Sequence, residues 1–174
     1  MIRSWGVLTL TGSAQPCFGD TTTAAVPLPD SFGKIAVTVA STSRYQGGDR
    51  IIVAPETNTQ DILKIDSIAS STVLNCQSEG NAKTHTHPTS TQILLSIACA
   101  EIMVQNFSSA SNVVWLGTDN TVTSSGGGSA FGQALPGDIP YRFSNSVQFN
   151  AIRTSEPWMS GTNGQTCGIA AIVV

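Results

Sequence analysis

Two histidines, His85 and His87, are the residues whose spacing first suggests chemistry. Residues i and i+2 of a strand lie on one face, so both imidazoles could bind the same metal ion. The usual metal site of a jelly roll adds a carboxylate and a third histidine, and this chain has only two histidines. The pair also stands in a polar stretch just before Pro88. We therefore expect solvent-exposed histidines, and neither a metal nor another cofactor.

The other reactive side chains form no recognisable catalytic pattern. No serine lies in a GxSxG turn, which would present a nucleophile. Asp61 and Asp66 are five residues apart on an expected strand, so their carboxylates should point to opposite faces. The glycines at 126–128 lack the lysine and the helix of a phosphate-binding loop. The sequence predicts a protein that is not an enzyme.

The four cysteines, Cys17, Cys76, Cys99 and Cys167, are far apart and include no CxxC pair. An even number permits two disulfides, in three possible connectivities. The first ten residues lack the apolar segment of a secretory signal, so we expect a protein made and kept in a reducing cytoplasm. The thiols are therefore expected to be reduced and buried.

Charge and hydropathy exclude some partners. The net charge is −3 and charged residues make up 11% of the chain. Nucleic acids and anionic membranes attract basic surfaces, so neither is an expected partner. No apolar run approaches the roughly 20 residues that span a bilayer.

Short runs of alternating apolar and polar residues, separated by Gly, Pro, Asn, Ser and Thr, predict an all-β protein. In the first half we expect strands at 4–10, 34–39, 50–54, 61–68 and 72–77. Their close spacing is typical of a small antiparallel barrel. Ile62, Ile65 and Ile68 do not keep one phase, which indicates a bulge or bend.

A polar stretch at 79–92 separates this region from the second half. The apolar run at 93–106 could include helix, but its alternation favours a strand. Further strands are expected at 112–117, 120–124, 141–143, 146–153 and 167–174, with regular turns between them. The sequence thus predicts a domain at 1–90, with an arm and a small β-barrel, and a β-sandwich or jelly-roll domain at 91–174.

Residues 11–33 have no clear period and contain three prolines, which disfavour a central strand. Two interpretations are open: an arm that lies on a neighbouring molecule, or a loop packed on its own domain. Trp158 is expected in an exposed loop. The candidate interface residues are Phe18, Thr22, Pro27, Phe32 and Trp158.

Several stretches resemble virion structural proteins of tailed bacteriophages, above all capsid decoration (cement) proteins. They are TLTGSAQPCFGDTTTAA near the start, TSRYQGGDRIIV and DILKIDSIASSTVLNC in the middle, and IMVQNFSSASNVVWLGTDNTVTSSGG later. The resemblance implies a protein made in the host cytoplasm that binds the capsid exterior as a homodimer or homotrimer. Its partner would be the major capsid protein, whose neighbouring subunits it would clamp.

Two alternatives remain open. Related domains also occur in phage tail, neck and head-fibre proteins. The chain could therefore be one of these virion components. The second alternative is a carbohydrate-binding module that binds a host-surface glycan, with Trp158 and Phe131 as its aromatic platform.

Overall fold

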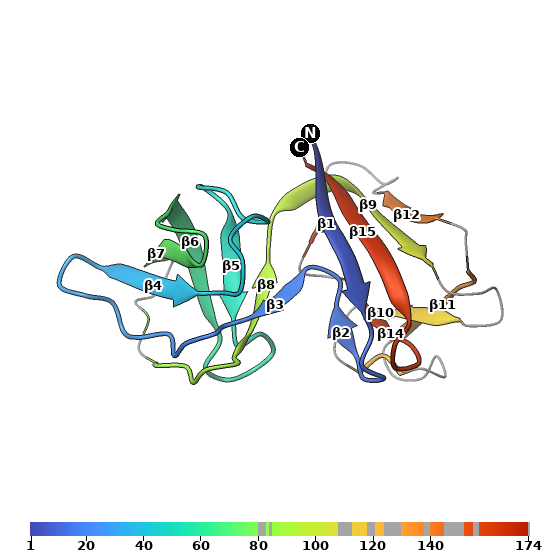
Figure 1. Cartoon of the computed structure of the whole chain (residues 1–174), viewed down its shortest axis with the longest axis horizontal. Coiled ribbons are helices and arrows are strands. Elements are labelled where there is room, and N and C mark those ends of the chain that lie inside the picture. Colours follow the sequence, from blue (N-terminus) through green and yellow to red (C-terminus); the bar gives the residue numbers. More distant parts are fainter. Residues whose placement is uncertain are drawn as a thin grey trace. The chain divides into compact units, whose positions relative to one another are not determined.

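The computed structural model describes residues 1–79, 83, 85–107, 113–117, 121–123, 130–137, 140–144, 152–154 and 157–173. This part of the chain consists of strands, turns and bends without a helix, so the predicted all-β class is confirmed. It accordingly contains no helix long and apolar enough to cross a membrane. The chain forms two compact units, residues 19–96 and residues 1–18 with 97–174 (Figure 1).

The unit at 19–96 is a small barrel-like sheet of six antiparallel strands. Their order is β3-β8-β5-β6-β7-β4, and the two outer strands approach each other through a bridge between Thr22 and Val39. Alternate residues of these strands point inward, where apolar side chains such as Leu63 and Ile65 are fully buried. The strands are β3 (Gly19–Thr21), β4 (Lys34–Thr38), β5 (Arg50–Val53), β6 (Asp61–Ile68), β7 (Val73–Ser78) and β8 (Gln92–Leu95).

A bulge in β6 confirms the irregular phase predicted for its isoleucines. The pairing of β6 with β7 shifts between Ile65 and Ser67. The turn before β5 packs on this bulge: a Cβ on Gly47 would lie 3.1 Å from the Asp66 carbonyl oxygen, and the Gly48 amide donates to the Ile65 carbonyl at 2.7 Å. The extra residue shifts the phase of β6 by one, so that Ile68 pairs with the buried Leu74 as Ile65 pairs with the buried Cys76. Ile68 itself, the last residue of the strand, is exposed.

The second unit is a two-sheet sandwich. One sheet has the order β1-β15-β9-β12, with β13 also on β9, and the other has the order β11-β10-β14-β2. Asn106 links the two sheets from within, because its side-chain amide donates to the Leu135 carbonyl at 3.0 Å. The strands are β1 (Ile2–Thr9), β2 (Gln15–Pro16), β9 (Ala98–Asn106), β10 (Val114–Gly117), β11 (Ala130–Leu135), β12 (Pro140–Ser144), β13 (Ile152–Arg153), β14 (Trp158–Ser160) and β15 (Thr166–Val173).

This division differs from the predicted domains at 1–90 and 91–174. The first strand β1 pairs along its whole length with the last strand β15, so residues 1–18 belong to the sandwich. The ring of Trp5 also packs against that of Phe18, with centroids 5.7 Å apart. The first expected strand is therefore present, but it belongs to the sheet formed by the second half of the chain.

Of the two interpretations left open for residues 11–33, the structure favours a segment that packs on its own chain over most of its length. This segment is integrated into its own chain, because β2 pairs with β14 and β3 pairs with β8. Cys17, Phe18 and Val26 are buried along it. Of the other expected strands, 146–151 lies outside the described residues, and 121–123 forms no strand. The strands β11 and β14 were not predicted, whereas the run at 93–106 forms strands β8 and β9, as favoured.

Candidate functional site

The loop between β3 and β4 carries the most exposed large apolar side chain among the described residues. Phe32 is 84% exposed, and Leu28, on the same loop, is 48% exposed. The loop runs from β3 to the far left of Figure 1, where it turns back into β4. Burying such a ring against a partner would release a large apolar area from water.

The end of this loop is a tightly hydrogen-bonded turn that holds Phe32 outward. One carboxylate oxygen of Asp30 accepts the Phe32 amide at 2.9 Å and the Lys34 amide at 2.8 Å. The Asp30 amide in turn donates to the Lys34 carbonyl at 2.9 Å. Gly33 has φ +75°, a conformation that favours glycine. The turn therefore presents Phe32 on an ordered backbone.

The start of the loop is fixed by an antiparallel bridge between Val26 and His87. The Val26 amide donates to the His87 carbonyl at 2.8 Å, and the His87 amide donates back to the Val26 carbonyl at 3.0 Å. Val26 is fully buried. The loop thus leaves the barrel from a backbone position that depends on where His87 lies.

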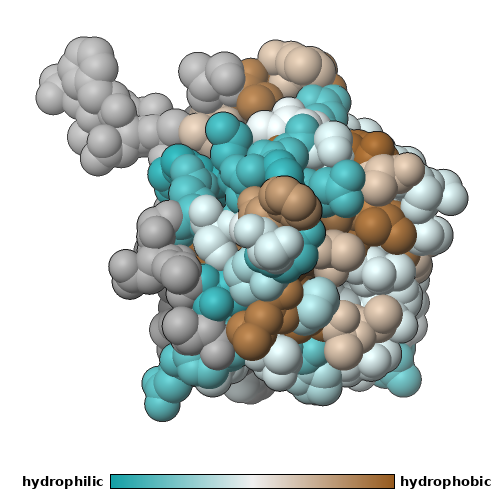
Figure 2. Space-filling view, turned by 90° about the vertical axis from the view of Figure 1, so that its left-hand side faces the viewer, coloured by the Kyte–Doolittle hydropathy of each residue, from teal (hydrophilic) through white to brown (hydrophobic). Residues whose placement is uncertain are grey.

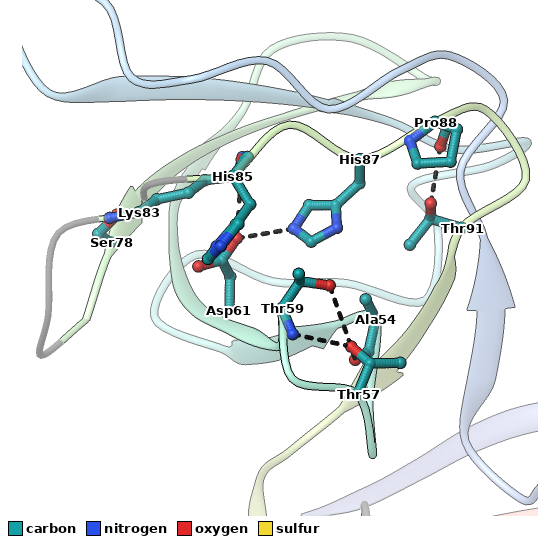
Figure 3. Close-up of polar contacts among 10 residues, drawn as sticks. All are labelled: Ala54, Thr57, Thr59, Asp61, Ser78, Lys83, His85, His87, Pro88 and Thr91. Carbon is teal, nitrogen blue, oxygen red and sulfur yellow. Dashed lines mark hydrogen bonds and ion pairs between the residues drawn. The ribbon is translucent and has the colours of Figure 1, made fainter.

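His87 lies in a buried polar cluster with Asp61 and Lys83 (Figure 3). Its ring nitrogen Nε2 is 2.7 Å from Oδ2 of Asp61, and Lys83 Nζ is 3.8 Å from the same oxygen. The side chains of Lys83, His87 and Asp61 are 0%, 3% and 12% exposed. Lys83 Nζ also donates to the His85 carbonyl. A carboxylate, an amine and an imidazole therefore meet around one oxygen atom.

The phase of β6 explains why a carboxylate lies there. Asp61 begins β6 and shares its inward face with Leu63 and Ile65, so its side chain points toward the interior at one end of the barrel. A buried carboxylate needs hydrogen-bonding or charged partners, which the connector at 83–91 supplies. Burial lowers the pKa of the Lys83 amine, and the Asp61 carboxylate opposes this shift.

The sequence-predicted interface residues do not form one surface. Pro27 and Phe32 are exposed on the loop. Phe18 and Thr22 are buried, because they belong to the sandwich core and to the bridge that joins β3 and β4. The expectation that Trp158 lies in an exposed loop is wrong. Trp158 lies in β14, where it pairs with Pro16 and Gly117, and it is buried. The side chain of Phe131 lies outside the described residues.

The histidine prediction is wrong in part. His85 is exposed as expected, but His87 is buried against Asp61. The described residues contain no group of three or more His, Cys, Asp or Glu side chains that could hold a metal ion. The cysteine prediction is confirmed, since all four thiols are free and buried. Burial raises the pKa of the Cys76 thiol to about 12 and that of Cys167 to about 11.

The outer edge of the sandwich is a second exposed feature. Within the described part of the chain β1 pairs with β15 alone, which leaves its other side as the edge of the sheet. Ile2 and Val7 are exposed on this strand, as is the preceding Met1. An edge strand presents backbone donors and acceptors that another strand can pair with.

Comparison of the chain with protein-family models, with curated proteins and with solved structures finds no match. We therefore infer function from the geometry of this chain. Its two strongest features, the Phe32 turn and the edge strand β1, are both suited to contact another protein.

Proposed function

We propose that this protein is a non-enzymatic virion structural protein that binds the outer surface of a phage capsid. There it stabilises contacts between neighbouring subunits of the major capsid protein, after assembly in the host cytoplasm. The observation that carries the proposal is the ordered Phe32 turn, because it presents an exposed aromatic ring on a fixed backbone. The sequence resemblance to capsid decoration proteins supports the choice of partner.

An aromatic anchor suits this task for an energetic reason. Interfaces gain most of their affinity from a few large side chains that fill pockets on the partner. A side chain already held in its bound position loses less conformational entropy on binding. Figure 2 shows one side of the molecule, where apolar residues are scattered among polar ones, so a local anchor describes this surface better than a broad apolar face.

Self-association would strengthen such a contact. In our proposal a homodimer or homotrimer forms through the edge strand β1, which would pair its exposed backbone edge and cover Ile2 and Val7. Two or three linked copies each place one Phe32 on the shell. Once one copy is bound, the others bind at a high effective concentration, so weak single contacts give strong attachment.

Cosedimentation with empty heads tests the proposed partner. The heads are assembled from the major capsid protein of the phage that, in this proposal, encodes the chain, and the wild-type protein should sediment with them. Phe32→Ala should weaken binding at least tenfold, whereas Ile62→Ala, which truncates an exposed side chain on the outward face of β6, should bind like wild type. Equal binding by all three proteins would refute the role of Phe32. Binding to purified tails but not to heads would instead favour a tail or neck component.

Light scattering over a range of concentrations tests the edge. The wild-type protein should be a dimer or trimer, and Val7→Lys should be a monomer because a charge on an edge strand opposes pairing. Ile62→Lys puts the same charge on an exposed position of β6 and should leave the oligomer intact. A monomeric wild type, both in solution and on heads, would overturn this part of the proposal.

A further inference from the structure

We propose that Asp61 and Lys83 join in an intramolecular amide bond, an isopeptide, and that His87 transfers the protons for the reaction. The proposal rests on the placement of the three side chains around one carboxylate oxygen. It concerns a covalent modification within the barrel and does not depend on what the protein binds.

The geometry brings the reacting groups together in a buried place. Lys83 Nζ is 3.8 Å from Asp61 Oδ2, which places the amine beside the carboxyl group whose Cγ it would attack. Both side chains are almost completely removed from solvent. The strand position of Asp61 and the backbone bridge of His87 to Val26 hold two of the three groups in place. An ordered, intramolecular pair reacts far faster than the same groups free in solution.

Burial also favours the reactive protonation state. An amine attacks a carboxyl group only when it has lost its proton, and desolvation lowers the pKa of Lys83. A carboxyl group is attacked more readily when its oxygen is protonated or accepts a strong hydrogen bond. His87 Nε2, at 2.7 Å from Oδ2, is placed to supply that proton.

The condensation of the Lys83 amine with the Asp61 carboxyl group needs no other reactant. The ammonium of Lys83 gives one proton, through His87, to Oδ2 of Asp61, and its nitrogen lone pair then attacks Cγ of Asp61 to form a C–N bond. His87 accepts a proton from the attacking nitrogen and delivers it to the departing oxygen. The C–O bond breaks and one water molecule leaves. An ammonium and a carboxylate have then become a neutral amide and water, with no change in oxidation state.

Such a bond would fix the base of the Phe32 loop. It would tie the first residue of β6 to the connector that carries His87, and His87 bridges to Val26 at the start of that loop. The bond would also remove two ionised groups from a site where charges are poorly solvated. The barrel would therefore resist unfolding by force or denaturant more than its hydrogen bonds alone would allow.

The mass of the intact wild-type protein tests the proposal directly. After purification and incubation at neutral pH, we expect a mass below that of the sequence by one water molecule. Trypsin cleaves after Arg50, Lys64 and Lys83, so the unlinked chain yields 51–64 as a free peptide. The linked chain should instead yield 51–64 joined to 65–142, because cleavage at Lys83 is blocked.

Variants distinguish the proposed chemistry from a simple ion pair. Lys83→Arg and His87→Gln should both have the full mass and release the free peptide. The control is Lys34→Arg, which alters an ion pair with Asp66 on the exposed barrel surface and should keep the loss of water. Full mass and a free 51–64 peptide in the wild-type protein, even after long incubation, would overturn the proposal. A deficit that persists in His87→Gln would overturn the role of His87.

Discussion

Removing the Asp30 carboxylate should loosen the turn that presents Phe32 and weaken capsid binding with little effect on the barrel. In Asp30→Ala two backbone amides, those of Phe32 and Lys34, lose their shared acceptor. A hydrogen bond contributes about 0.5–1.5 kcal/mol, and the lower end applies here because the turn is exposed and water can replace the acceptor. We therefore expect the ordered conformation of the turn to become less stable by about 1 kcal/mol.

The matched control is Asp30→Asn, which keeps a side-chain oxygen at the same position. If the turn must be re-ordered on binding, about 1 kcal/mol corresponds to about fivefold weaker binding to heads for Asp30→Ala. Asp30→Asn should stay close to wild type. Amide exchange measured by NMR should become faster at Phe32 and Lys34 in the alanine variant, while amides of β6 and β7 keep their protection. Unchanged exchange at both amides would refute the view that this carboxylate orders the turn.

Two further predictions concern packing and titration. Gly161→Ala should lower the free energy of unfolding in urea by about 1–3 kcal/mol, because its Cβ would lie 2.7 Å from a methyl group of the buried Leu10 and 2.3 Å from the side-chain oxygen of Gln165. Gly33→Ala, with no atom within 4 Å of its Cβ but a positive φ, should cost about 1 kcal/mol, and equal values would contradict the steric argument. The Cys76 thiol keeps its proton up to about pH 12 in the fold and up to about 9.0 when unfolded. Its contribution to stability is therefore full below about pH 9 and falls by about 1.4 kcal/mol per unit as the pH rises toward about 12. Urea unfolding between about pH 9 and 11 should show a shallower decline in Cys76→Ala, and an identical slope would refute the assignment.

Local alternation predicted four of the barrel strands, because β4, β5, β6 and β7 alternate between more and less buried residues. In β6 the alternation of Leu63 and Ile65 with polar neighbours identified the strand, and the displaced phase of Ile68 indicated the bulge. These signals lie within a few residues of one another, so a single sequence contains them. The same holds for the buried thiols of Cys76, Cys99 and Cys167, which stand in apolar or strand-like runs.

The pairing of β1 with β15 has no such local signal. Both strands alternate, and alternation alone does not show which strand a given strand pairs with. The segment at 11–33 is similar: Phe18 and Val26 are buried in different units, so their spacing follows no strand period. A proline-rich segment without a period therefore favoured a free arm as much as a packed loop, although its Cys17, Phe18 and Val26 are buried.

The buried cluster could be traced in the sequence only from its acidic member. Asp61 shares the inward phase of Leu63 and Ile65, which already requires a cationic or hydrogen-bonding partner inside the barrel. Nothing local indicates that the partners are Lys83 and His87, because the polar connector around them has the composition of an exposed linker. The connector folds inward because leaving Asp61 buried and unpaired would be more unfavourable than burying three polar groups together. The contact of His87 with Asp61 also places the His87 backbone beside Val26, with which it forms the bridge. The partners of one buried carboxylate therefore also determine where the Phe32 loop begins.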